Sequence, residues 1–196
     1  MTKQDLRKLY KKIRDGIPDE VRAAKSAAVC ARVLSSAAYA EAERVFVFLS
    51  FGGEVDTTGI VVDALARGKR VAVPVTKAGG VMDFVALRSM DDLVLSRFDV
   101  PEPSSGEAVL PNEQTLMLVP GLVFGRDGFR VGYGKGFYDR YLARVMVDGL
   151  WFPRIGIGFD EQLAESVPHD GFDMALDGVW TDERMLKRAD CGSSPQ

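Results

Sequence analysis

A glycine-rich segment beyond the middle of the chain combines residue types that bind phosphate groups. Arg130 precedes it and Lys135 lies within it, among glycines at every second position, Gly132, Gly134 and Gly136. Glycines let backbone N–H groups turn inward without a Cβ in the way, and successive N–H groups form a concave anion site. A helix is expected to begin directly after Gly136, and its N-terminus adds partial positive charge. The segment therefore predicts phosphate binding, with a plain flexible turn as the alternative.

The first turn of that expected helix carries a carboxylate, Asp139. Mg²⁺ prefers one or two carboxylates together with phosphates and waters, so Asp139 is a candidate to hold a magnesium ion that bridges phosphate oxygens. A purely structural role, as a favourable charge at a helix N-terminus, stays open. The segment is not a Walker A loop, because no G-K-[ST] follows the glycines. It also lacks the G-x-G-x-x-G that directly follows a strand in dinucleotide-binding folds.

The composition excludes several classes of protein. The chain has 196 residues, of which 46% are hydrophobic and 27% are charged, so its usage is that of an ordinary globular protein. Its one histidine, His169, excludes catalysis by a histidine pair and a multi-histidine metal site, and we expect it to be a surface loop residue. The formal net charge of −3 argues against a general nucleic-acid binder, which usually has a basic excess.

The cysteines and the apolar runs indicate a cytoplasmic protein. Cys30 and Cys191 lie far apart and form no metal-ligand or redox spacing, so a reduced, intracellular setting is the simplest interpretation. No apolar run approaches the roughly 20 residues that span a bilayer. The basic N-terminus is not followed by the apolar segment of a signal peptide. We therefore expect a soluble cytoplasmic protein with no membrane partner.

The chain alternates between helical and strand-like patterns. An amphipathic helix is expected at the N-terminus, a second from about Asp19 to Ala38, a third from Thr57 or Thr58 to Arg67, and a long loop at 99–111. Short apolar runs predict buried strands at 45–49, 71–75, 116–120 and 154–159, a hairpin partner at 81–87 and a short last strand at 179–180. This alternation predicts an α/β fold with a mostly parallel sheet, on which ligands bind outside the carboxyl ends of the strands.

Several of these segments together resemble the 5-formyltetrahydrofolate cyclo-ligase family. The stretch 119–142, VPGLVFGRDGFRVGYGKGFYDRYL, is similar to the family signature, and the stretch 48–57, FLSFGGEVDT, is similar to its folate-side loop. Lys3 and Arg7 on the first helix fit the family's K-x-x-x-R nucleotide contact, although a solvated basic face is the other interpretation. The resemblance spans roughly residues 3–182. Phe137 replaces the first of the usual paired tyrosines, so the hydrogen bond of that hydroxyl is lost.

The resemblance implies a fold, a reaction and a set of contacts. The fold would be a single three-layer α/β/α domain over 1–190, Rossmann-like and related to the sugar-phosphate isomerase and CoA-transferase type, with a flexible tail at 191–196. The reaction would be the ATP- and Mg²⁺-dependent conversion of 5-formyltetrahydrofolate to 5,10-methenyltetrahydrofolate, with release of ADP and phosphate. The residues implied to contact ATP are Lys3, Arg7, Arg130, Gly132, Tyr133, Gly134, Lys135, Gly136, Phe137 and Tyr138, with Lys135, Arg130 and Asp139 in catalytic roles.

The same resemblance implies the folate and metal contacts. Asp139 and Asp173 would hold magnesium, with Asp177 as a competitor for the second position. Glu54 would pair with the donor edge of the pterin, and Phe51 lies where it could touch the pterin ring. The residues implied to line the folate site are Leu49, Glu54, Tyr133, Gly134, Lys135, Gly136 and Phe137.

Two other functions stay open at this stage. One is a sugar-phosphate isomerase or acyl-transfer enzyme that needs no ATP and uses a base such as histidine or glutamate. The other is a nucleotide- or folate-binding relative that has lost turnover. In each case we expect a monomer with a small-molecule partner, and the substrate could carry a polyglutamate tail.

Overall fold

The computed structural model of the protein describes residues 1–95 and 101–188. Its helices are α1 Lys3–Asp15, α2 Asp19–Ser35, α3 Ala37–Glu41, α4 Thr58–Ala66 and α5 Phe137–Val145, with short 3-10 helices η1 Ala78–Gly80, η2 Met90–Asp92 and η3 Asp160–Gln162. Its strands are β1 Arg44–Phe46, β2 Arg70–Thr76, β3 Met82–Leu87, β4 Leu93–Leu95, β5 Pro101–Pro103, β6 Thr115–Val119, β7 Val123–Gly125, β8 Arg130–Val131, β9 Arg154–Ile157, β10 Leu163–Ala164, β11 Gly178–Trp180 and β12 Met185–Lys187. The proposed tail at 191–196, including Cys191, lies outside the described residues.

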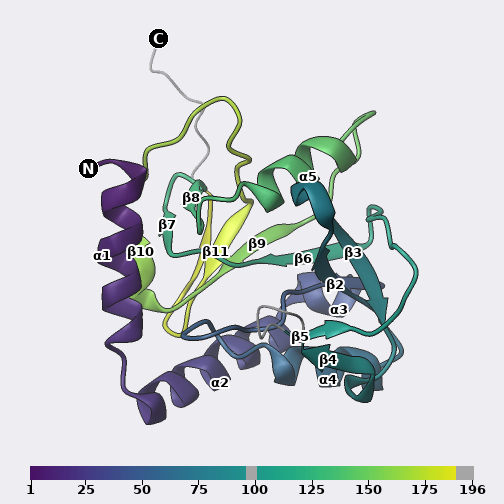
Figure 1. Ribbon diagram of the computed structural model, residues 1–196. Helices are drawn as coiled ribbons and strands as arrows, with labels where there is room; N and C mark the ends of the chain where they lie inside the picture. Colours follow the sequence, from purple (N-terminus) through teal and green to yellow (C-terminus); the bar gives the residue numbers. More distant parts are fainter. Residues whose placement is uncertain (96–100, 189–196) are drawn as a thin grey trace.

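A seven-stranded sheet forms the centre of the molecule, in the order β12-β11-β9-β6-β1-β2-β3 (Figure 1). The five central strands run parallel, and the two edge strands, β12 and β3, run antiparallel to their neighbours. The predicted α/β fold with a mostly parallel sheet is therefore confirmed. The strands β6 and β9 are buried throughout, as continuous apolar runs in parallel sheets require.

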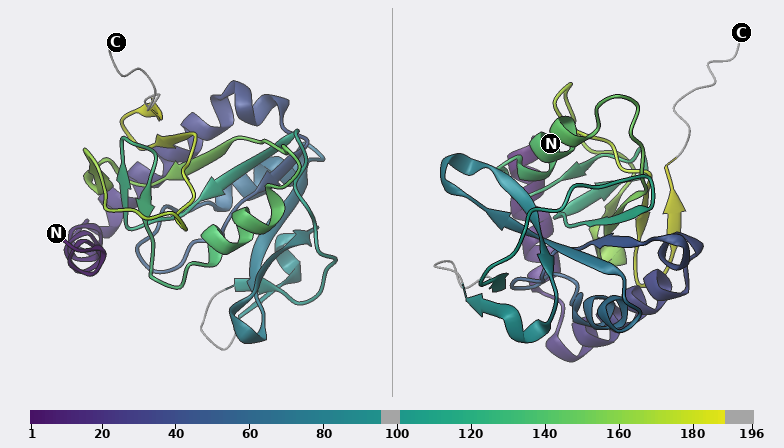
Figure 2. Two further views of the ribbon diagram at one scale, coloured as in Figure 1. Left: turned by 90° about the horizontal axis from the view of Figure 1, so that it is seen from above. Right: turned by 90° about the vertical axis from the view of Figure 1, so that its right-hand side faces the viewer.

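Helices cover both faces of this sheet (Figure 2, left). One face packs against α2, α3 and α4 through Val29, Tyr39 and Ile60, and the other packs against α5 through Tyr141 and Leu142. A third, smaller cluster places Leu6 of α1 against Val123 and Val131 of the β7–β8 hairpin and against Val167. The α1 helix thus packs on a small sheet of the order β10-β7-β8 and not on the main one.

The structure differs from the sequence expectations in four places. The helix expected from Asp19 to Ala38 is two helices, because Ser36 adopts an extended conformation and its side chain accepts a hydrogen bond from the Tyr39 amide, which starts α3. In the run 45–49, only Val45 and Phe46 belong to strand β1. Strand β5 pairs with β4 inside the expected loop 99–111, of which residues 99 and 100 lie outside the described part. The strand at 179–180 is not the last, since β12 folds back against it.

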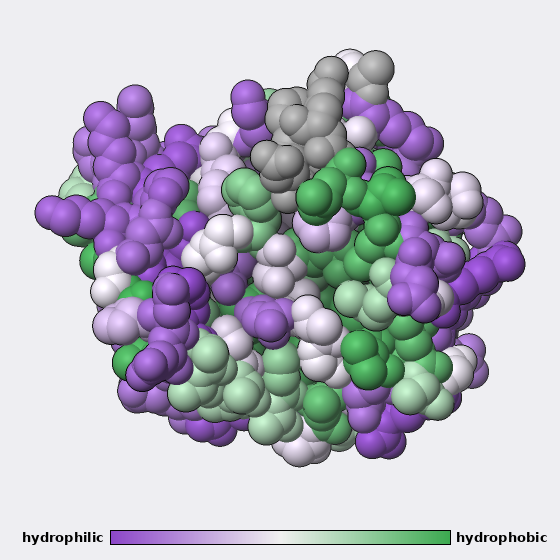
Figure 3. Space-filling view, turned by 60° about the horizontal axis from the view of Figure 1, so that its bottom comes forward, coloured by the Kyte–Doolittle hydropathy of each residue, from purple (hydrophilic) through white to green (hydrophobic). Residues whose placement is uncertain are grey.

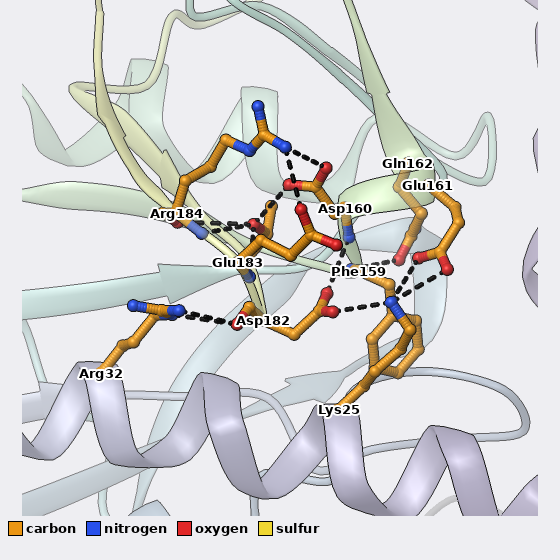
Figure 4. A network of polar contacts seen from close by, with 10 residues as sticks. Lys25, Arg32, Phe159, Asp160, Glu161, Gln162, Asp182, Glu183 and Arg184 are labelled. Carbon is orange, nitrogen blue, oxygen red and sulfur yellow. Dashed lines mark hydrogen bonds and ion pairs between the residues drawn. The ribbon is translucent and has the colours of Figure 1, made fainter.

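A polar network joins α2 to the segments that follow β9 and β11 (Figure 4). Asp182 is central to it, since its carboxylate accepts hydrogen bonds from Lys25 Nζ at 2.6 Å and from the Asp160 amide at 2.8 Å. Its backbone carbonyl accepts a further bond from Arg32 Nη2 at 2.8 Å, and Arg184 pairs with Asp160. The side chain of Asp182 is only 7% exposed, so this network fixes α2 against the carboxyl edge of the sheet.

On the face shown in Figure 3, on the side of α4 and β4, hydrophobic side chains gather in an area that hydrophilic side chains border. Val62 of α4 and Val94 and Leu95 of β4 are exposed apolar residues. Among the described residues, no helix combines the length and the apolar character needed to cross a bilayer.

Candidate active site

A cavity of about 370 Å³ lies beyond the carboxyl end of β6, where the chain leaves the sheet. Open α/β sheets bind ligands at this edge. The walls come from α1, from the end of β6, from the segment joining β8 to α5, and from the loop before β11. The residues that line it are Lys3, Arg7, Pro120, Arg130, Val131, Gly132, Tyr133, Gly134, Lys135, Gly136, Phe137, Tyr138, Asp139 and Asp173. The predicted phosphate loop, both cations of the first helix and both predicted metal ligands therefore share one cavity.

The phosphate loop has the backbone that its glycines predict. Gly134 has φ 92° and Gly136 has φ 62°, a region that residues with a Cβ rarely adopt. Gly136 is the N-cap of α5, and no side chain caps that end of the helix, so its first amide groups are available to an anion. A Cβ on Gly132 would meet no atom within 4 Å and would occupy open space beside the cavity. The loop is thus shaped to take a bulky anion against its backbone.

The first helix brings its two predicted cations to this loop. Arg7 Nε donates a hydrogen bond of 2.9 Å to the Gly132 carbonyl, and the Arg7 guanidinium also lies close to Gly134. Lys3 Nζ pairs with the carboxylates of Asp173 and Asp170. Burial opposes the charged form of Lys3, but its hydrogen bonds and charge interactions with Asp173 and Asp170 outweigh burial and raise its pKa. The basic face of this helix is therefore not simply a solvated surface.

Arg130 and Asp139 form a partly buried pair at the floor of the cavity. Arg130 is only 8% exposed, and its Nη2 lies 3.3 Å from Asp139 Oδ1. The same Asp139 oxygen accepts a hydrogen bond of 3.1 Å from the Met174 amide. Arg130 Nη1 donates to the Met174 carbonyl, so the pair also holds the loop before β11. Asp139 is thereby more than a partner of the helix dipole.

The carboxylates at the cavity fit a magnesium ion that also binds phosphate. Asp139 Oδ2 and Asp173 Oδ1 accept no hydrogen bond from the described residues, whereas the other oxygen of each is engaged. Within 1–95 and 101–188 there is no group of three or more His, Cys, Asp or Glu that could hold a metal. Two carboxylates are what Mg²⁺ uses when phosphates and waters complete its shell. Asp177 does not line the cavity, and Arg154 donates a hydrogen bond of 2.8 Å to each of its carboxylate oxygens.

Tyr138 contributes a buried hydroxyl without a partner in the described part of the chain. Its ring lies beneath the Arg130 guanidinium, whose Cζ is 5.8 Å from the ring centre. A buried hydroxyl without a hydrogen bond is unfavourable by about 1–3 kcal/mol. Since Tyr138 lines the cavity, a bound ligand can supply the missing partner.

The two predicted folate-side residues of the β1–α4 connection lie outside the cavity lining. Leu49 packs against the main core cluster. Glu54 reaches the phosphate loop indirectly, through a hydrogen bond of 2.6 Å from the Tyr133 hydroxyl, and its other oxygen accepts from the Phe51 amide at 3.0 Å. Burial raises the pKa of Glu54. The hydrogen bonds from Tyr133 and Phe51 and the charge of Arg14 lower this pKa, but burial has the larger effect. Phe51 is half exposed and remains accessible to a ligand.

Arg14 is a residue of this region that the sequence interpretation missed. It is buried, with 3% of its surface exposed, and its Nη1 donates a hydrogen bond of 2.6 Å to the Tyr133 hydroxyl. The available signal was its spacing of seven residues from Arg7, which puts both on one face of the helix. His169, by contrast, is the expected exposed loop residue, and its ring stacks on Phe129 at 3.6 Å.

Comparisons with known proteins agree on one family. The sequence model of the 5-formyltetrahydrofolate cyclo-ligase family matches residues 1–182. The 5-formyltetrahydrofolate cyclo-ligase of Mus musculus is 31% identical over 186 residues, which cover 90% of this chain and 92% of the mouse protein. That of Escherichia coli K12 is 33% identical over 152 residues, covering 74% and 80%.

Solved structures agree with this result. The Aquifex aeolicus 5,10-methenyltetrahydrofolate synthetase superposes with a TM-score of 0.84 at 28% identity, over 100% of this chain and 97% of that chain. A 5,10-methenyltetrahydrofolate synthetase from Mycoplasma pneumoniae shares the fold, with a TM-score of 0.75 at 20% identity, over 93% of this chain and 99% of that chain. The match of the family model over residues 1–182 shows that this chain is a ligase and belongs to the 5-formyltetrahydrofolate cyclo-ligase family.

Proposed function

We propose that this enzyme uses ATP and Mg²⁺ to convert 5-formyltetrahydrofolate to 5,10-methenyltetrahydrofolate, with release of ADP and phosphate. The observation that carries the ATP requirement is the single cavity in which Lys3, Arg7 and Lys135 surround a glycine loop and an uncapped helix N-terminus. Fixed cations and inward N–H groups stabilise the charge of a phosphoryl group in transfer. A sugar-phosphate isomerase would also bind a phosphate, but the match of the 5-formyltetrahydrofolate cyclo-ligase family model over residues 1–182 favours the cyclo-ligase reaction.

The proposed reaction places both nucleophiles on the substrate. The formyl oxygen attacks the γ-phosphorus of ATP, the bond to the bridging oxygen breaks, and ADP leaves. N10 of the folate then attacks the formyl carbon, loses its proton, and phosphate leaves with the former formyl oxygen. The protein has to position the two substrates and neutralise charge, which is how phosphoryl transfer is mainly catalysed. Because the substrates supply the nucleophiles, this mechanism needs no catalytic histidine, and the one histidine of the chain lies exposed on a loop.

We assign the nucleotide contacts to the cations, the glycine loop and Tyr138. Lys3 and Arg7 approach from α1, and Arg130 lies with Asp139 at the floor of the cavity. Lys135 makes no ion pair with the described residues, so its charge is free to follow the transferred phosphoryl group. The residues assigned to ATP are Lys3, Arg7, Arg130, Gly132, Tyr133, Gly134, Lys135, Gly136, Phe137 and Tyr138, of which Lys135 and Arg130, together with Asp139, act on the reacting phosphate.

Asp139 and Asp173 would hold magnesium, each through its free carboxylate oxygen. When bound, the ion would neutralise the charge of the phosphate oxygens. Asp173 is preferred to Asp177 as the second ligand, because Asp173 lines the cavity while Asp177 is engaged by Arg154. Lys3 then serves two purposes, since it holds Asp173 in place and adds positive charge beside it.

The folate is assigned to the side of the loop that faces Glu54. The carboxylate of Glu54 can accept hydrogen bonds from the donor edge of the pterin, with the rings of Tyr133 and Phe137 nearby. The residues assigned to folate are Leu49, Glu54, Tyr133, Gly134, Lys135, Gly136 and Phe137. Tyr133, Lys135 and Phe137 thereby stand between the two substrates.

The test is an assay with ATP, Mg²⁺ and 5-formyltetrahydrofolate that follows the near-ultraviolet absorbance of the methenyl product. The expected result is product formation that requires ATP and releases one ADP per turnover. Lys135→Ala is expected to lose most turnover while its melting temperature stays unchanged. Lys187→Ala is the matched control, because that lysine is exposed on the edge strand β12. No ATP-dependent product from the wild type, or full activity of Lys135→Ala, would contradict the proposal.

A further inference from the structure

Arg14 is part of a hydrogen-bonded chain that joins three distant segments. It belongs to α1, and its Nη1 donates to the hydroxyl of Tyr133, in the phosphate loop, at 2.6 Å. The Tyr133 hydroxyl in turn donates to Glu54 Oε1, in the β1–α4 connection, at 2.6 Å. Arg14 Nη2 lies 3.3 Å from Asp15 Oδ1, and Arg14 Nε is buried without a partner among the described residues.

The direction of each hydrogen bond in this chain follows from which groups can donate and which can accept. A guanidinium can only donate, so the Tyr133 oxygen must accept from Arg14. The hydroxyl has one proton, and with its oxygen facing Arg14 that proton is directed to Glu54. Glu54 therefore has to accept, as an ionised carboxylate does. Replacement of Arg14 would free the Tyr133 hydroxyl to turn and would remove the cation beyond it.

Burial makes this arrangement unusual for a merely structural arginine. The side chain of Arg14 is 4% exposed, and Asp15, its ion-pair partner within the described part of the chain, is 39% exposed. A buried charge is unfavourable unless it is well paired, and here a neutral phenol and one peripheral carboxylate take the place of a full ion pair. The arrangement makes sense when the guanidinium acts on Glu54 through the phenol.

We propose that Arg14 is a positioning residue for the folate half of the site, which orients the Tyr133 hydroxyl and through it holds Glu54 as an ionised acceptor for the pterin. This inference rests on the proposed function, because it takes Glu54 as the folate contact. It extends that function to a residue outside the cavity lining, and it predicts that Arg14 controls folate and not ATP. Lys3 and Arg7, on the same helix, would control ATP.

The charged and titratable groups around Glu54 determine the expected pH effect. They are Arg14, Tyr133, Tyr138 and, beside Gly53, Asp15. Burial already raises the pKa of Glu54, and Tyr133 and Arg14 oppose that effect. Loss of Arg14 raises this pKa further, so Glu54 becomes protonated at a higher pH and loses acceptor capacity. The acidic limb of kcat/KM for folate is therefore expected to move to higher pH.

The test compares Arg14→Met, Arg14→Lys and Tyr133→Phe with the wild type in the turnover assay. Loss of a hydrogen bond in a charged chain corresponds to a rise in the folate KM of about tenfold or more. In the two Arg14 variants the ATP KM is expected to stay within about twofold, and Arg14→Lys, which keeps the charge, is expected to recover part of the loss. Tyr133→Phe is compared by its folate KM alone, because Tyr133 is also assigned to the ATP contacts. Tyr10→Phe is the control, since it removes a hydroxyl from the same helix without touching Glu54.

The outcomes separate the two proposals. A wild type without ATP-dependent turnover overturns the proposed function and this inference together. An active wild type whose Arg14 and Tyr133 variants keep the folate KM, or whose Arg14 variants raise the folate and ATP KM equally, overturns the inference alone. Should Arg14→Met fail to fold, Arg14→Lys decides the question by its folate and ATP KM, and Tyr133→Phe by its folate KM. An unchanged pH profile in folded Arg14 variants also contradicts the proposal.

Discussion

Asp173 and Asp177 lie four residues apart and have different partners. Asp173 faces the cavity and pairs with Lys3, while Asp177 forms a two-pronged pair with Arg154, whose side chain is only 10% exposed. The Asp173 carboxylate thus keeps one oxygen accessible to a ligand, whereas both oxygens of Asp177 are hydrogen-bonded to Arg154. The same residue type therefore lines the cavity in one position and is held in an internal ion pair in the other.

This contrast predicts opposite effects of one substitution. Asp173→Asn is expected to raise the Mg²⁺ concentration for half-maximal activity about tenfold, since amide oxygens bind Mg²⁺ more weakly, with little change in melting temperature because its ion pair is partly exposed. Asp177→Asn is expected to lower the free energy of unfolding by about 2–3 kcal/mol, because it leaves Arg154 without its charge partner. Its Mg²⁺ requirement should stay unchanged. Thermal melts and Mg²⁺ titrations that gave the reverse pattern would exclude the assignment of Asp173.

At the scale of elements, α1 connects the cavity to the small sheet of β7 and β8. Its first turn is held by a capping box, in which the Thr2 side chain accepts from the Asp5 amide and the Asp5 carboxylate accepts from the Thr2 amide at 3.0 Å. Hydrogen bonding to Thr2 lowers the pKa of Asp5, so the cap persists at neutral pH and weakens as the pH falls below the usual range of aspartate.

Thr2→Ala is expected to loosen the first turn, which carries Lys3. A cap is worth about 1 kcal/mol, so the ATP KM should rise by about two- to fivefold, while kcat changes less. Ser89→Ala is the matched control, because Ser89 forms the corresponding capping box on η2, a short helix none of whose residues line the cavity. Steady-state kinetics of both variants test this. Equal effects of the two substitutions on the ATP KM would show that the cap does not act through the site.

The elements that the sequence predicted correctly are those with a strong local pattern. Strand β6 has a continuous apolar run, and α5 begins where the glycines end. The missed elements depend on distant partners. Strand β10 has two residues and pairs with β7, some 40 positions earlier, so no local pattern indicates it. The break between α2 and α3 at Ser36 depends on a side-chain hydrogen bond within a sequence that otherwise favours helix.

The same distinction applies to the candidate site. The phosphate loop is contiguous, so its shape followed from glycine spacing and charge. Arg14 was missed because its partner Tyr133 lies 119 positions away, and burial of an arginine cannot be seen in a sequence of alternating basic and apolar residues. Asp173 could be proposed only from the family resemblance, since an isolated aspartate in a loop usually has a turn role.

At the scale of the whole molecule, the cavity joins the two ends of the chain. Lys3 contacts Asp173, and Arg7 contacts Gly132, so the proposed nucleotide, bound between them, would stabilise the long-range contacts of the fold. Any ligand that binds the folded state alone raises its stability by mass action. The effect should be measurable as a shift in melting temperature.

At an ATP concentration about 100 times its Kd, with Mg²⁺ present, the free energy of unfolding is expected to rise by about 2.7 kcal/mol, which corresponds to a shift of roughly 5–10 °C. Gly132→Ala is expected to fold as stably as the wild type, since its Cβ meets no atom, but to lose this shift because the methyl group occupies the phosphate space. Gly59→Ala in α4 is the control and should keep the shift. Thermal melts in which Gly132→Ala retained the full ATP effect would contradict this use of the loop.

The span of the Lys3–Asp173 contact also has a consequence for the protein during its synthesis. The two residues are 170 positions apart, which at ribosomal speed corresponds to a wait of roughly 10 to 30 s between the appearance of the helix and that of its partner. During that interval the nascent chain carries the basic helix without the loop that contains Asp173. An incomplete chain that ends before Asp173 therefore lacks part of the cavity lining, so the cavity can be completed only after Asp173 has emerged.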